Sequence, residues 1–433
     1  MKELYDIYLA AGCRVTTDSR TLEPGTLFFA LKGEHFDGND YAMQALEKGA
    51  SRAVVSEDVP FDDPRLIRVP DTYACLRDLA IWHRTHVCGG KLPVIGLTGT
   101  NGKTTTKELT AAVLSARFRV CATRGNLNND IGVPLSLLSI RPDTQVAVIE
   151  MGASHPDDIA KLVRIAQPDY GLITNVGKAH LQGFGSFAGV KAAKGELYRW
   201  LGSRAGSVVF LNEDDADLRG MAAGLPCHVF GYGVAYQRAE ILPTSPEEPF
   251  LRLSVSGHVL STRLVGSYNA PNVLAALAVG TYFGVPFADA AAALAAYEPR
   301  NQRSQMQRTG RNTLIVDAYN ANPSSMAASL RHFAAFSGAP KLALLGDMRE
   351  LGADSVAEHV AILRLLEEYG IPAYLVGEEF GKALAQHPCP LVRGHLPGAA
   401  DLAALPELAV LRGCSILIKG SRSMQMEQVI PVL

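Results

Sequence analysis

The chain has 433 residues, with 41 Lys and Arg against 43 Asp and Glu, and 48% of its residues are hydrophobic. This length is too great for a single ordinary core, so we expect two or three domains. The balanced charge gives no electrostatic case for nucleic acid or an anionic membrane as the main partner. The hydrophobic content argues against a disordered chain.

Cysteine usage and the N-terminus favour a cytoplasmic protein. Seven cysteines are scattered without a Cys-x-x-Cys pair, which is typical of reduced thiols. The first residues, MKELYDIYLAAG, lack the basic start and apolar core of an export signal. A charge-free run extends from Leu264 to Ala288, but its two prolines, two asparagines and three glycines favour a buried loop plus helix over a membrane span. We expect a cytoplasmic protein that is not a membrane protein, and we expect a monomer.

Residues 1–90 form the first predicted unit, a small mixed α/β domain. Two short apolar runs, TLFFAL and RAVVS, are typical of strands, and DYAMQALEKGA between them has helical spacing. The turn-rich stretch KGEHFDGND follows the first of these strands.

Residues 91–303 form a second unit in which strand, loop and helix alternate. Its strand signals are continuous apolar runs, which suit a parallel sheet covered on both faces: PVIGLT, QVAVIE, YGLITNV and SVVFLN. A helix is predicted over KTTTKELTAAVLSARF. We expect this unit to end near Pro299 to Arg303.

Residues 304–433 repeat the alternation on a smaller scale. Four apolar runs predict a doubly wound, Rossmann-like sheet: TLIVDAY, KLALLGD, PAYLVG and SILIKGS. Ala-rich segments of the second and third units, such as ADAAAALAAY at 288–297 and AADLAALPELAV at 399–410, are expected to be helices rather than linkers. The whole chain is therefore predicted to be an α/β protein of three domains.

The stretch GLTGTNGKTTTK, residues 96–107, is similar to a phosphate-binding loop but departs from the usual spelling. The common pattern has Gly five positions before Gly-Lys-Thr, where this chain has Leu97. A phosphate loop needs a strand before it, small residues whose backbone N–H groups turn inward, and a helix N-terminus after it. All three are predicted here, which favours a nucleotide site over a chance glycine turn. Lys103 would then reach the β and γ phosphates, and the Thr104 hydroxyl would bind Mg²⁺.

Polar residues also follow other predicted strands of the central unit. Glu150 ends QVAVIE and is better explained as a Mg²⁺ carboxylate than as a solvated strand end. The segment GNLNNDIGVPLSLL places Asn126, Asn128 and Asn129 before a helix. One of them would be expected to cap that helix, but three suggest a polar pocket wall. His180 follows a further strand, although a lone His is more often structural.

Further candidates lie later in the chain. KAAKGELY places Lys194 near the start of a helix, where the lysine by itself would be a surface residue. Asn269 and Asn272 flank another helix start and could be caps. Asp317 and Asn320 follow a strand of the third unit, at the end where such sheets meet ligands.

The loop Thr-Gly-Thr-Asn-Gly-Lys-Thr resembles the ATP loop of the Mur ligase family, whose members build the peptide stem of bacterial cell-wall precursors. The displaced first glycine is what that family shows. The loop by itself also resembles folylpolyglutamate synthetase and cyanophycin synthetase, so it leaves both open. The resemblance implies that ATP is bound by the loop residues Gly99, Thr100, Asn101, Gly102, Lys103, Thr104 and Thr105.

The Mur ligase resemblance extends to the other motifs and implies a role for each. Asn269 and Asn272 would approach the adenine of ATP, and Asp317 its ribose, with Asn320 in the loop that closes over it. Arg303 would reach the ATP phosphates. A second Mg²⁺ would be held by His180 together with Lys194, which CO₂ would convert to a carbamate. The substrate channel beside the nucleotide would be lined by Asn126, Asn128 and Asn129.

Within the family, several motifs resemble those of the members that join D-alanyl-D-alanine to UDP-N-acetylmuramoyl-tripeptide. These are GNLNND, HLQGFGS, DAYNANPSSM, GDMRELG and KGSRSMQME. The resemblance covers the chain from about Asp18 to Glu427. It implies that residues 1–90 bind the UDP-muramoyl peptide, that 91–303 bind ATP, and that 304–433 close over ATP and bind the dipeptide. Candidates for holding the uridine diphosphate are Ser19, Arg20, Lys32 and Asp37.

Two alternatives stay open at this point. The neighbouring ligase of the family adds a diamino acid or lysine one step earlier, but its usual Asp-Asn-Pro motif is missing here. A nucleotide-binding scaffold without turnover is the other alternative. The residues that weigh against such a scaffold are Lys103, Thr104, Glu150, His180 and Lys194.

Overall fold

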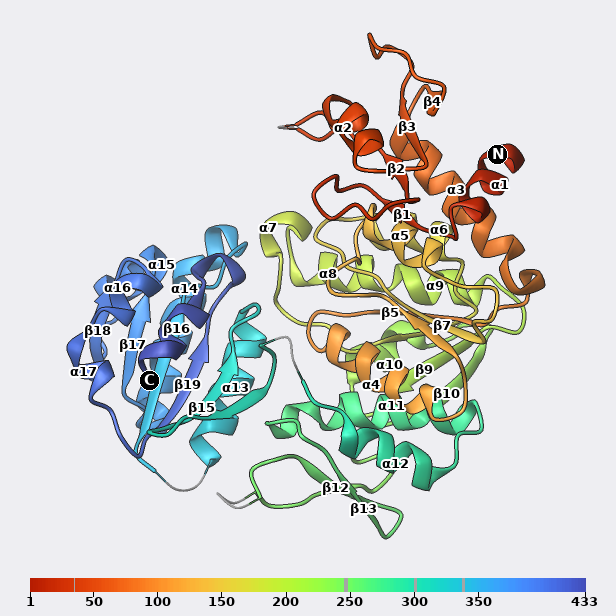
Figure 1. The fold of residues 1–433 in the computed structure, drawn as a ribbon. Coiled ribbons are helices and arrows are strands. Elements are labelled where there is room, and N and C mark those ends of the chain that lie inside the picture. Colours follow the sequence, from red (N-terminus) through yellow and green to blue (C-terminus); the bar gives the residue numbers. More distant parts are fainter. Residues whose placement is uncertain (35, 245–247, 300–301, 337–338) are drawn as a thin grey trace.

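The protein folds into three α/β domains, each built around its own sheet (Figure 1). The computed structural model describes residues 1–34, 36–244, 248–299, 302–336 and 339–433. The predicted end of the second unit, near Pro299 to Arg303, therefore includes two positions, 300–301, that lie outside the described residues.

The N-terminal domain has a sheet of four parallel strands in the order β1-β2-β3-β4. The strands are β1 (Val15–Thr16), β2 (Leu27–Phe29), β3 (Arg52–Ser56) and β4 (Leu66–Val69). The helices are α1 (Lys2–Ala10), α2 (Ala42–Glu47) and α3 (Thr72–His86). The apolar runs predicted as strands become β2 and β3, whereas the short β1 and the half-exposed β4 lack such a run.

The central domain is built on six parallel strands in the order β10-β9-β8-β5-β7-β6. The strands are β5 (Val94–Thr98), β6 (Val120–Ala122), β7 (Val146–Glu150), β8 (Tyr170–Ile173), β9 (Val208–Asn212) and β10 (His228–Tyr232). The continuous apolar runs predicted β5, β7, β8 and β9, which are covered on both faces.

Helices cover both faces of the central sheet (Figure 1). One face packs on α4 (Lys103–Ser115), α11 (Ala270–Tyr282) and α12 (Phe287–Ala296). The other packs on α5 (Gly132–Leu138), α6 (Asp158–Ala166) and α9 (Glu196–Gly202). The N-terminal domain attaches on this second side, where α3 contacts α5 and α6. The remaining helices of the domain are α7 (Leu181–Phe184), α8 (Phe187–Lys194) and α10 (Ala216–Ala222).

A small antiparallel sheet extends the central domain beside α12, and the sequence patterns did not predict it. Its strands are β11 (Glu240–Ile241), β12 (Arg252–Val255) and β13 (His258–Ser261). The charge-free run from Leu264 to Ala288 is a loop followed by the buried helix α11, as predicted. Within the part of the chain that the structure describes, no helix combines the length and apolar character needed to cross a membrane.

The C-terminal domain has a six-stranded sheet in the order β14-β15-β19-β16-β17-β18, in which only the edge strand β14 is antiparallel. Its strands are β14 (Gln305–Arg308), β15 (Thr313–Asp317), β16 (Lys341–Gly346), β17 (Ala373–Val376), β18 (Val392–Leu396) and β19 (Ser415–Lys419). Its helices are α13 (Pro323–Ala335), α14 (Ser355–Tyr369), α15 (Glu378–Gln386), α16 (Ala399–Ala403) and α17 (Pro406–Ala409). The four predicted strands are present, and the two edge strands, β14 and β18, were not predicted.

The two large sheets direct their strand ends into one cleft between the central and C-terminal domains. The loops after β5, β7 and β8 line it from the central domain, and the loops after β15, β16 and β19 line it from the C-terminal domain. Ligands of parallel α/β sheets bind at the carboxyl ends of the strands. The carboxyl ends of the strands of the central sheet therefore face those of the C-terminal sheet across the cleft.

Candidate active site

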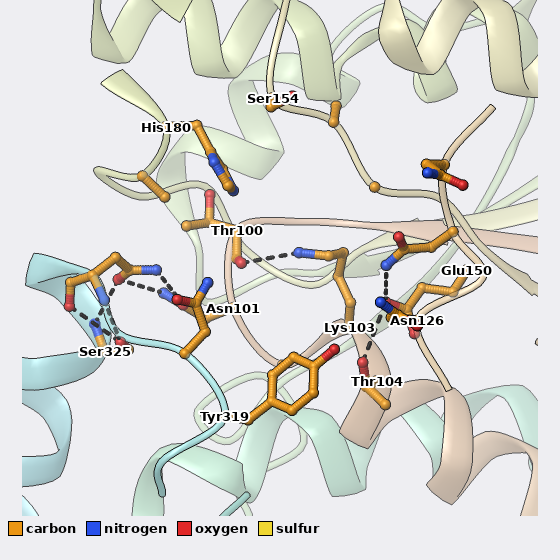
Figure 2. A pocket seen from close by; sticks show the side chains of 18 of the residues that line it. Thr100, Asn101, Lys103, Thr104, Asn126, Glu150, Ser154, His180, Tyr319 and Ser325 are labelled. Atoms are coloured by element: carbon orange, nitrogen blue, oxygen red, sulfur yellow. Dashed lines mark hydrogen bonds between the residues drawn. The ribbon is translucent and has the colours of Figure 1, made fainter. Parts of the chain in front are cut away.

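The cleft between the two domains has a volume of about 1690 Å³ and gathers most of the predicted site residues. Those that line it are Thr100, Asn101, Gly102, Lys103, Thr104, Thr105, Asn126, Asn128, Asn129, Glu150, His180, Asn269, Asn272, Arg303, Asp317 and Asn320. Figure 2 shows several of them from close by, with the loop after β5 at the centre.

Two glycines give the loop after β5 its shape. Gly99 has φ +146°, and a Cβ there would lie 2.0 Å from Oγ1 of Thr174. Gly102 has φ +78°, and a Cβ there would lie 2.6 Å from Oδ1 of Asn272. Side chains are excluded at both positions by backbone conformation and by space. The unusual spacing of the glycines thus fits a loop that turns tightly against β8 and α11.

Lys103 is the first residue of α4, and its ammonium bends back over the loop. It donates to the carbonyl oxygen of Gly99 at 2.8 Å. It also donates to that of Thr100 at 3.1 Å, the bond drawn in Figure 2. Burial lowers the pKa of Lys103 to about 8, with Glu150 opposing and Arg303 reinforcing this shift. No described side chain caps α4, so the N–H groups of its first turn can bind an anion.

Glu150, at the end of β7, joins the loop to the asparagine segment. Its Oε1 accepts from the Thr104 hydroxyl at 3.2 Å and from the Asn128 amide at 2.7 Å. Its Oε2 is buried without a hydrogen-bond donor among the described residues, and Nζ of Lys107 is 4.0 Å away. A buried carboxylate oxygen left in this way can accept a cation. Within the described residues, no group of three or more His, Cys, Asp or Glu side chains could hold a metal by itself.

The three asparagines before α5 make different contacts. Asn129 Oδ1 accepts from the N–H of Gly132, the first residue of that helix, and so satisfies one free N–H group as a cap would, although the N-cap position itself is Ile131. Asn128 instead reaches Glu150, and Asn126 lines the cleft. The prediction of a cap and the prediction of a polar wall therefore each hold for part of the segment.

His180 and Lys194 both lie close to the Phe184 ring. The His180 ring centroid is 6.4 Å from that of Phe184, and Nζ of Lys194 is 5.4 Å from it. Lys194 is 2% exposed and donates to the carbonyl of Ala153 at 3.2 Å. Lys194 lies near a helix start, as expected, because it is the last residue of α8 and α9 begins at Glu196, but it does not line the cleft directly.

Burial is the main reason that the neutral forms of Lys194 and His180 are favoured. Burial lowers the pKa of Lys194 well below its ordinary value, and the positive charge of Lys103 adds to this effect. Burial likewise lowers the pKa of His180, while the Glu350 carboxylate acts in the opposite direction. An uncharged lysine amine is the form that can react with CO₂.

Asn269 and Asn272 form a buried polar chain at the start of α11 rather than simple caps. The Asn269 amide donates to the Val265 carbonyl at 2.9 Å, and its Oδ1 accepts from Asn272 at 2.9 Å. Asn272 Oδ1 in turn accepts from the Thr106 hydroxyl at 3.1 Å. Helix α11 is thereby tied to α4, the helix that begins at the loop.

Arg303 lies at the junction of the two domains, and the C-terminal domain contributes Asp317 and two residues that the predictions missed, Tyr319 and Lys419. The Arg303 guanidinium lies 3.7 Å from the ring centroid of Tyr319, a cation–π contact. Asp317 forms a buried ion pair with Lys419 and accepts from the Ser329 hydroxyl at 3.1 Å. Lys419 lies near the end of the predicted strand run SILIKGS and is the last residue of β19, so its place close to a strand end was the available signal.

Two more asparagines complete the loop. Asn175 follows β8 and holds the backbone of Asn101 from both sides, accepting from its N–H at 3.0 Å and donating to its carbonyl at 2.9 Å. Asn322, from the C-terminal domain, donates to Oδ1 of Asn101 at 2.8 Å (Figure 2). Asn175 lies within the predicted strand run YGLITNV, and Asn322 follows TLIVDAY; neither was predicted to contact the loop.

The four candidates of the N-terminal domain lie outside the cleft. Arg20 is ion-paired with Asp18 at 2.8 Å, and Lys32 with Asp37 at 3.3 Å. The carbonyl of Ser19 accepts from Lys48. The N-terminal domain reaches the cleft instead through α3, whose side chains there include Tyr73, Arg77 and Asp78.

Comparisons with known proteins agree along the whole chain. Three family models match: Mur ligase family, catalytic domain, over residues 14–77; Mur ligase middle domain over 97–280; and Mur ligase, glutamate ligase domain, over 302–422. The UDP-N-acetylmuramoyl-tripeptide–D-alanyl-D-alanine ligase of Escherichia coli strain K12 is 38% identical over 97% of this chain and 93% of its own length.

Solved structures give the same result. MurF from Acinetobacter baumannii has a TM-score of 0.82 and 32% identity over 96% of this chain and 92% of that one. MurF ligase from Thermotoga maritima, solved in complex with ADP, has a TM-score of 0.82 and 27% identity over 97% and 96%. The family models, the relatives and the three-domain fold agree, and this chain belongs to the Mur ligase family.

Proposed function

We propose that this protein is an ATP-dependent ligase that joins D-alanyl-D-alanine to UDP-N-acetylmuramoyl-tripeptide, releasing ADP and phosphate. The observation that carries the proposal is that the phosphate-binding loop, Glu150 and Arg303 line one cleft in a chain 38% identical to a ligase of that name. The product would be the UDP-muramoyl pentapeptide of peptidoglycan synthesis.

The chemistry requires two anions to meet. The terminal carboxylate of the tripeptide attacks the γ phosphorus of ATP, ADP leaves, and an acyl phosphate forms. The amine of the dipeptide then attacks the acyl carbon, an amide bond forms, and phosphate leaves. Lys103 and Arg303 line the cleft from its two sides, and their charges would offset the repulsion between carboxylate and phosphates. Holding both substrates in line would by itself lower the barrier by about 7–11 kcal/mol.

The remaining predicted roles around ATP fit the same cleft. The first turn of α4 and the loop residues Gly99 to Thr105 would bind the phosphates. Asn269 and Asn272 would approach the adenine, and Asp317, with Asn320 nearby, the ribose. The wall formed by Asn126, Asn128 and Asn129 would face the muramoyl peptide.

We propose a Mg²⁺ site at Thr104 and Glu150. The buried, donor-free Oε2 of Glu150 beside the Thr104 hydroxyl fits an ion that takes few protein ligands and fills its shell with water and phosphate oxygens. When bound, the ion would reduce the negative charge of the phosphates. Thr104 and Asn128 would keep the carboxylate oriented through the two hydrogen bonds at Oε1.

We propose a second Mg²⁺ site at His180 and a carbamate on Lys194. Burial lowers the pKa of Lys194 and so favours the uncharged amine, whose nitrogen can add to CO₂ and lose a proton. The resulting carbamate would place an anion next to the phosphate loop, which suits a metal there.

The three domains would divide the work. Residues 1–90 would bind the UDP-muramoyl peptide, with Ser19, Arg20, Lys32 and Asp37 as candidates for the uridine diphosphate. Residues 91–303 would bind ATP, and 304–433 would close over it and bind the dipeptide. We propose that the enzyme acts in the cytoplasm as a monomer.

The first experiment measures phosphate release from ATP with UDP-N-acetylmuramoyl-tripeptide plus either D-alanyl-D-alanine or a single amino acid. Release that requires the dipeptide is the expected result. Release with UDP-muramoyl-dipeptide plus a diamino acid would move the activity one step earlier. Binding of ATP without release for any substrate pair would favour a scaffold. A Lys103→Met variant, expected to lose about 100-fold or more in rate, separates the activity from contaminating ATPases.

A further inference from the structure

The contact between His180 and Glu350 joins two domains at the edge of the cleft. His180 belongs to the loop before α7 of the central domain, and Glu350 follows β16 in the C-terminal domain. The Nδ1 atom of His180 is buried and lies in ion-pair contact with Oε2 of Glu350, although it has no hydrogen bond of regular geometry to any described residue. A second link lies beside it, because the N–H of Gln182 donates to the backbone carbonyl of Glu350 at 3.3 Å.

The backbone on both sides is held in an uncommon conformation. His180 has φ +51° and Glu350 has φ +63°, a region that residues other than glycine seldom adopt. Such conformations persist only where the surrounding structure enforces them, and they gather at functional sites. Here the two residues with left-handed backbone conformation are in contact with each other.

The loop that carries Glu350 is fixed by three successive backbone N–H groups. Asp347 donates to the Val376 carbonyl at 2.9 Å, Met348 to Nε2 of buried His359 at 3.0 Å, and Arg349 to the Ser421 hydroxyl at 2.9 Å. The Asp347 carboxylate, fully buried, also accepts from the first N–H groups of α15. The Glu350 side chain is thus presented from a rigid base within its own domain.

We propose that Glu350 is a positioning residue for His180: its carboxylate accepts the Nδ1 proton across the domain interface and so leaves the Nε2 lone pair free for a ligand in the cleft. A carboxylate on the distal nitrogen fixes both the tautomer and the ring orientation of a ligating histidine. Because the two residues come from different domains, Glu350 fixes the tautomer and ring orientation of His180 only when the C-terminal domain is in contact with α7 (Figure 1).

The effect of Glu350 on catalysis rests on the proposed function, but its effect on the His180 tautomer can be tested independently. Long-range ¹H–¹⁵N spectra of the full chain labelled at histidine, recorded above pH 8 with no metal added, report the tautomer of each ring. A His180→Asn variant assigns the His180 signal. We expect the Nδ1–H tautomer in the wild type and a shift towards Nε2–H in Glu350→Ala. Glu350→Gln keeps an acceptor oxygen and should restore most of the wild-type signal.

Kinetics provide the second readout, and Glu358→Gln is the matched control. Glu358 also bridges the two domains, through Nζ of Lys178 at 2.6 Å, but it does not contact His180. Glu350→Ala should lower kcat about 10–100-fold, with a smaller effect on the KM for ATP, and Glu350→Gln should lie between it and the wild type. Glu358→Gln should keep the His180 tautomer.

Each outcome decides the proposal. It is overturned if Glu350→Ala keeps the His180 tautomer, whatever its kcat, because the role would then be only to hold the domains together. It is also overturned if the tautomer shifts while kcat stays within twofold of the wild type. A wild-type protein that fails to ligate the proposed substrates would refute the proposed function, whereas the tautomer comparison would still decide whether Glu350 positions His180.

Discussion

The side-chain amides of Asn101 and Asn322 bind each other across the domain interface. Nδ2 of Asn322 donates to Oδ1 of Asn101 at 2.8 Å, and the reciprocal bond is 3.5 Å long. Asn322 also caps α13, because its Oδ1 accepts from the N–H of Ser325. The phosphate-binding loop is therefore in direct contact with the first turn of a C-terminal helix.

This contact predicts that Asn322 contributes to closure over ATP. Asn322→Ser keeps a capping oxygen but is too short to reach Asn101, so about 1 kcal/mol of interaction should be lost. We expect the KM for ATP to rise about fivefold, and small-angle scattering to show less compaction with an ATP analogue and the tripeptide substrate. Unchanged KM and unchanged compaction would argue against the contact as a closure element.

A carbamate on Lys194 predicts that activity depends on dissolved CO₂. Protein kept in CO₂-depleted buffer should lose activity, and added bicarbonate should restore it. With ¹³C-bicarbonate, a carbamate resonance should appear in the wild type and be missing from Lys194→Arg, which keeps the positive charge but has no amine that adds CO₂. A fully active enzyme without CO₂ and without that resonance would contradict the carbamate.

Local sequence determined much of the fold and of the ATP loop. The continuous apolar runs became β5, β7, β8 and β9 because both faces of the central sheet are covered. Edge strands lack this signal. The polar strand β14, QMQR, and the half-exposed β18, VRGHL, are strands because of the neighbours they pair with.

Contacts between distant segments could not be predicted in this way. Lys419 lies opposite Asp317 because β15 and β19 are neighbours in register, although 102 positions separate the two residues. The contact of Glu350 with His180 depends in addition on how two domains are placed. Motif spelling indicated which segments meet the cleft, but strand order and domain placement decide which side chains pair.

The ion pair between Asp317 and Lys419 predicts a strong effect of removing one partner. The Lys419 side chain is 2% exposed and that of Asp317 is 15% exposed. Lys419→Met leaves the carboxylate without its cation and should destabilise the C-terminal domain by about 3 kcal/mol.

The double variant Asp317→Asn with Lys419→Met removes both charges and should recover most of that loss, because no uncompensated charge remains. Urea unfolding of the wild type, the two single variants and the double variant measures the coupling. Strictly additive effects would show that the pair contributes no more than its separate side chains.

His83 links the N-terminal and central domains and predicts an acid-sensitive junction. Its Nε2 lies 3.0 Å from the carbonyl of Ile140, and its ring also contacts the hydroxyls of Tyr5 and Tyr8. Burial lowers the pKa of His83 from its ordinary value of 6.5 to about 4. Between these two values the unfolded chain binds the proton and the folded protein does not, so stability falls as the pH drops from 6.5 to 4.

His83 should contribute about 3 kcal/mol to the free energy of unfolding. This contribution is fully present above pH 6.5 and is lost below pH 4. Urea midpoints at several pH values, followed by the fluorescence of neighbouring Trp82, measure the slope. His83→Gln keeps a donor for the Ile140 carbonyl but does not titrate, so its slope between pH 4 and 6.5 should be shallower. His86→Gln changes an exposed histidine of the same helix and should keep the wild-type slope. Equal slopes for all three proteins would mean that other groups cause the acid sensitivity.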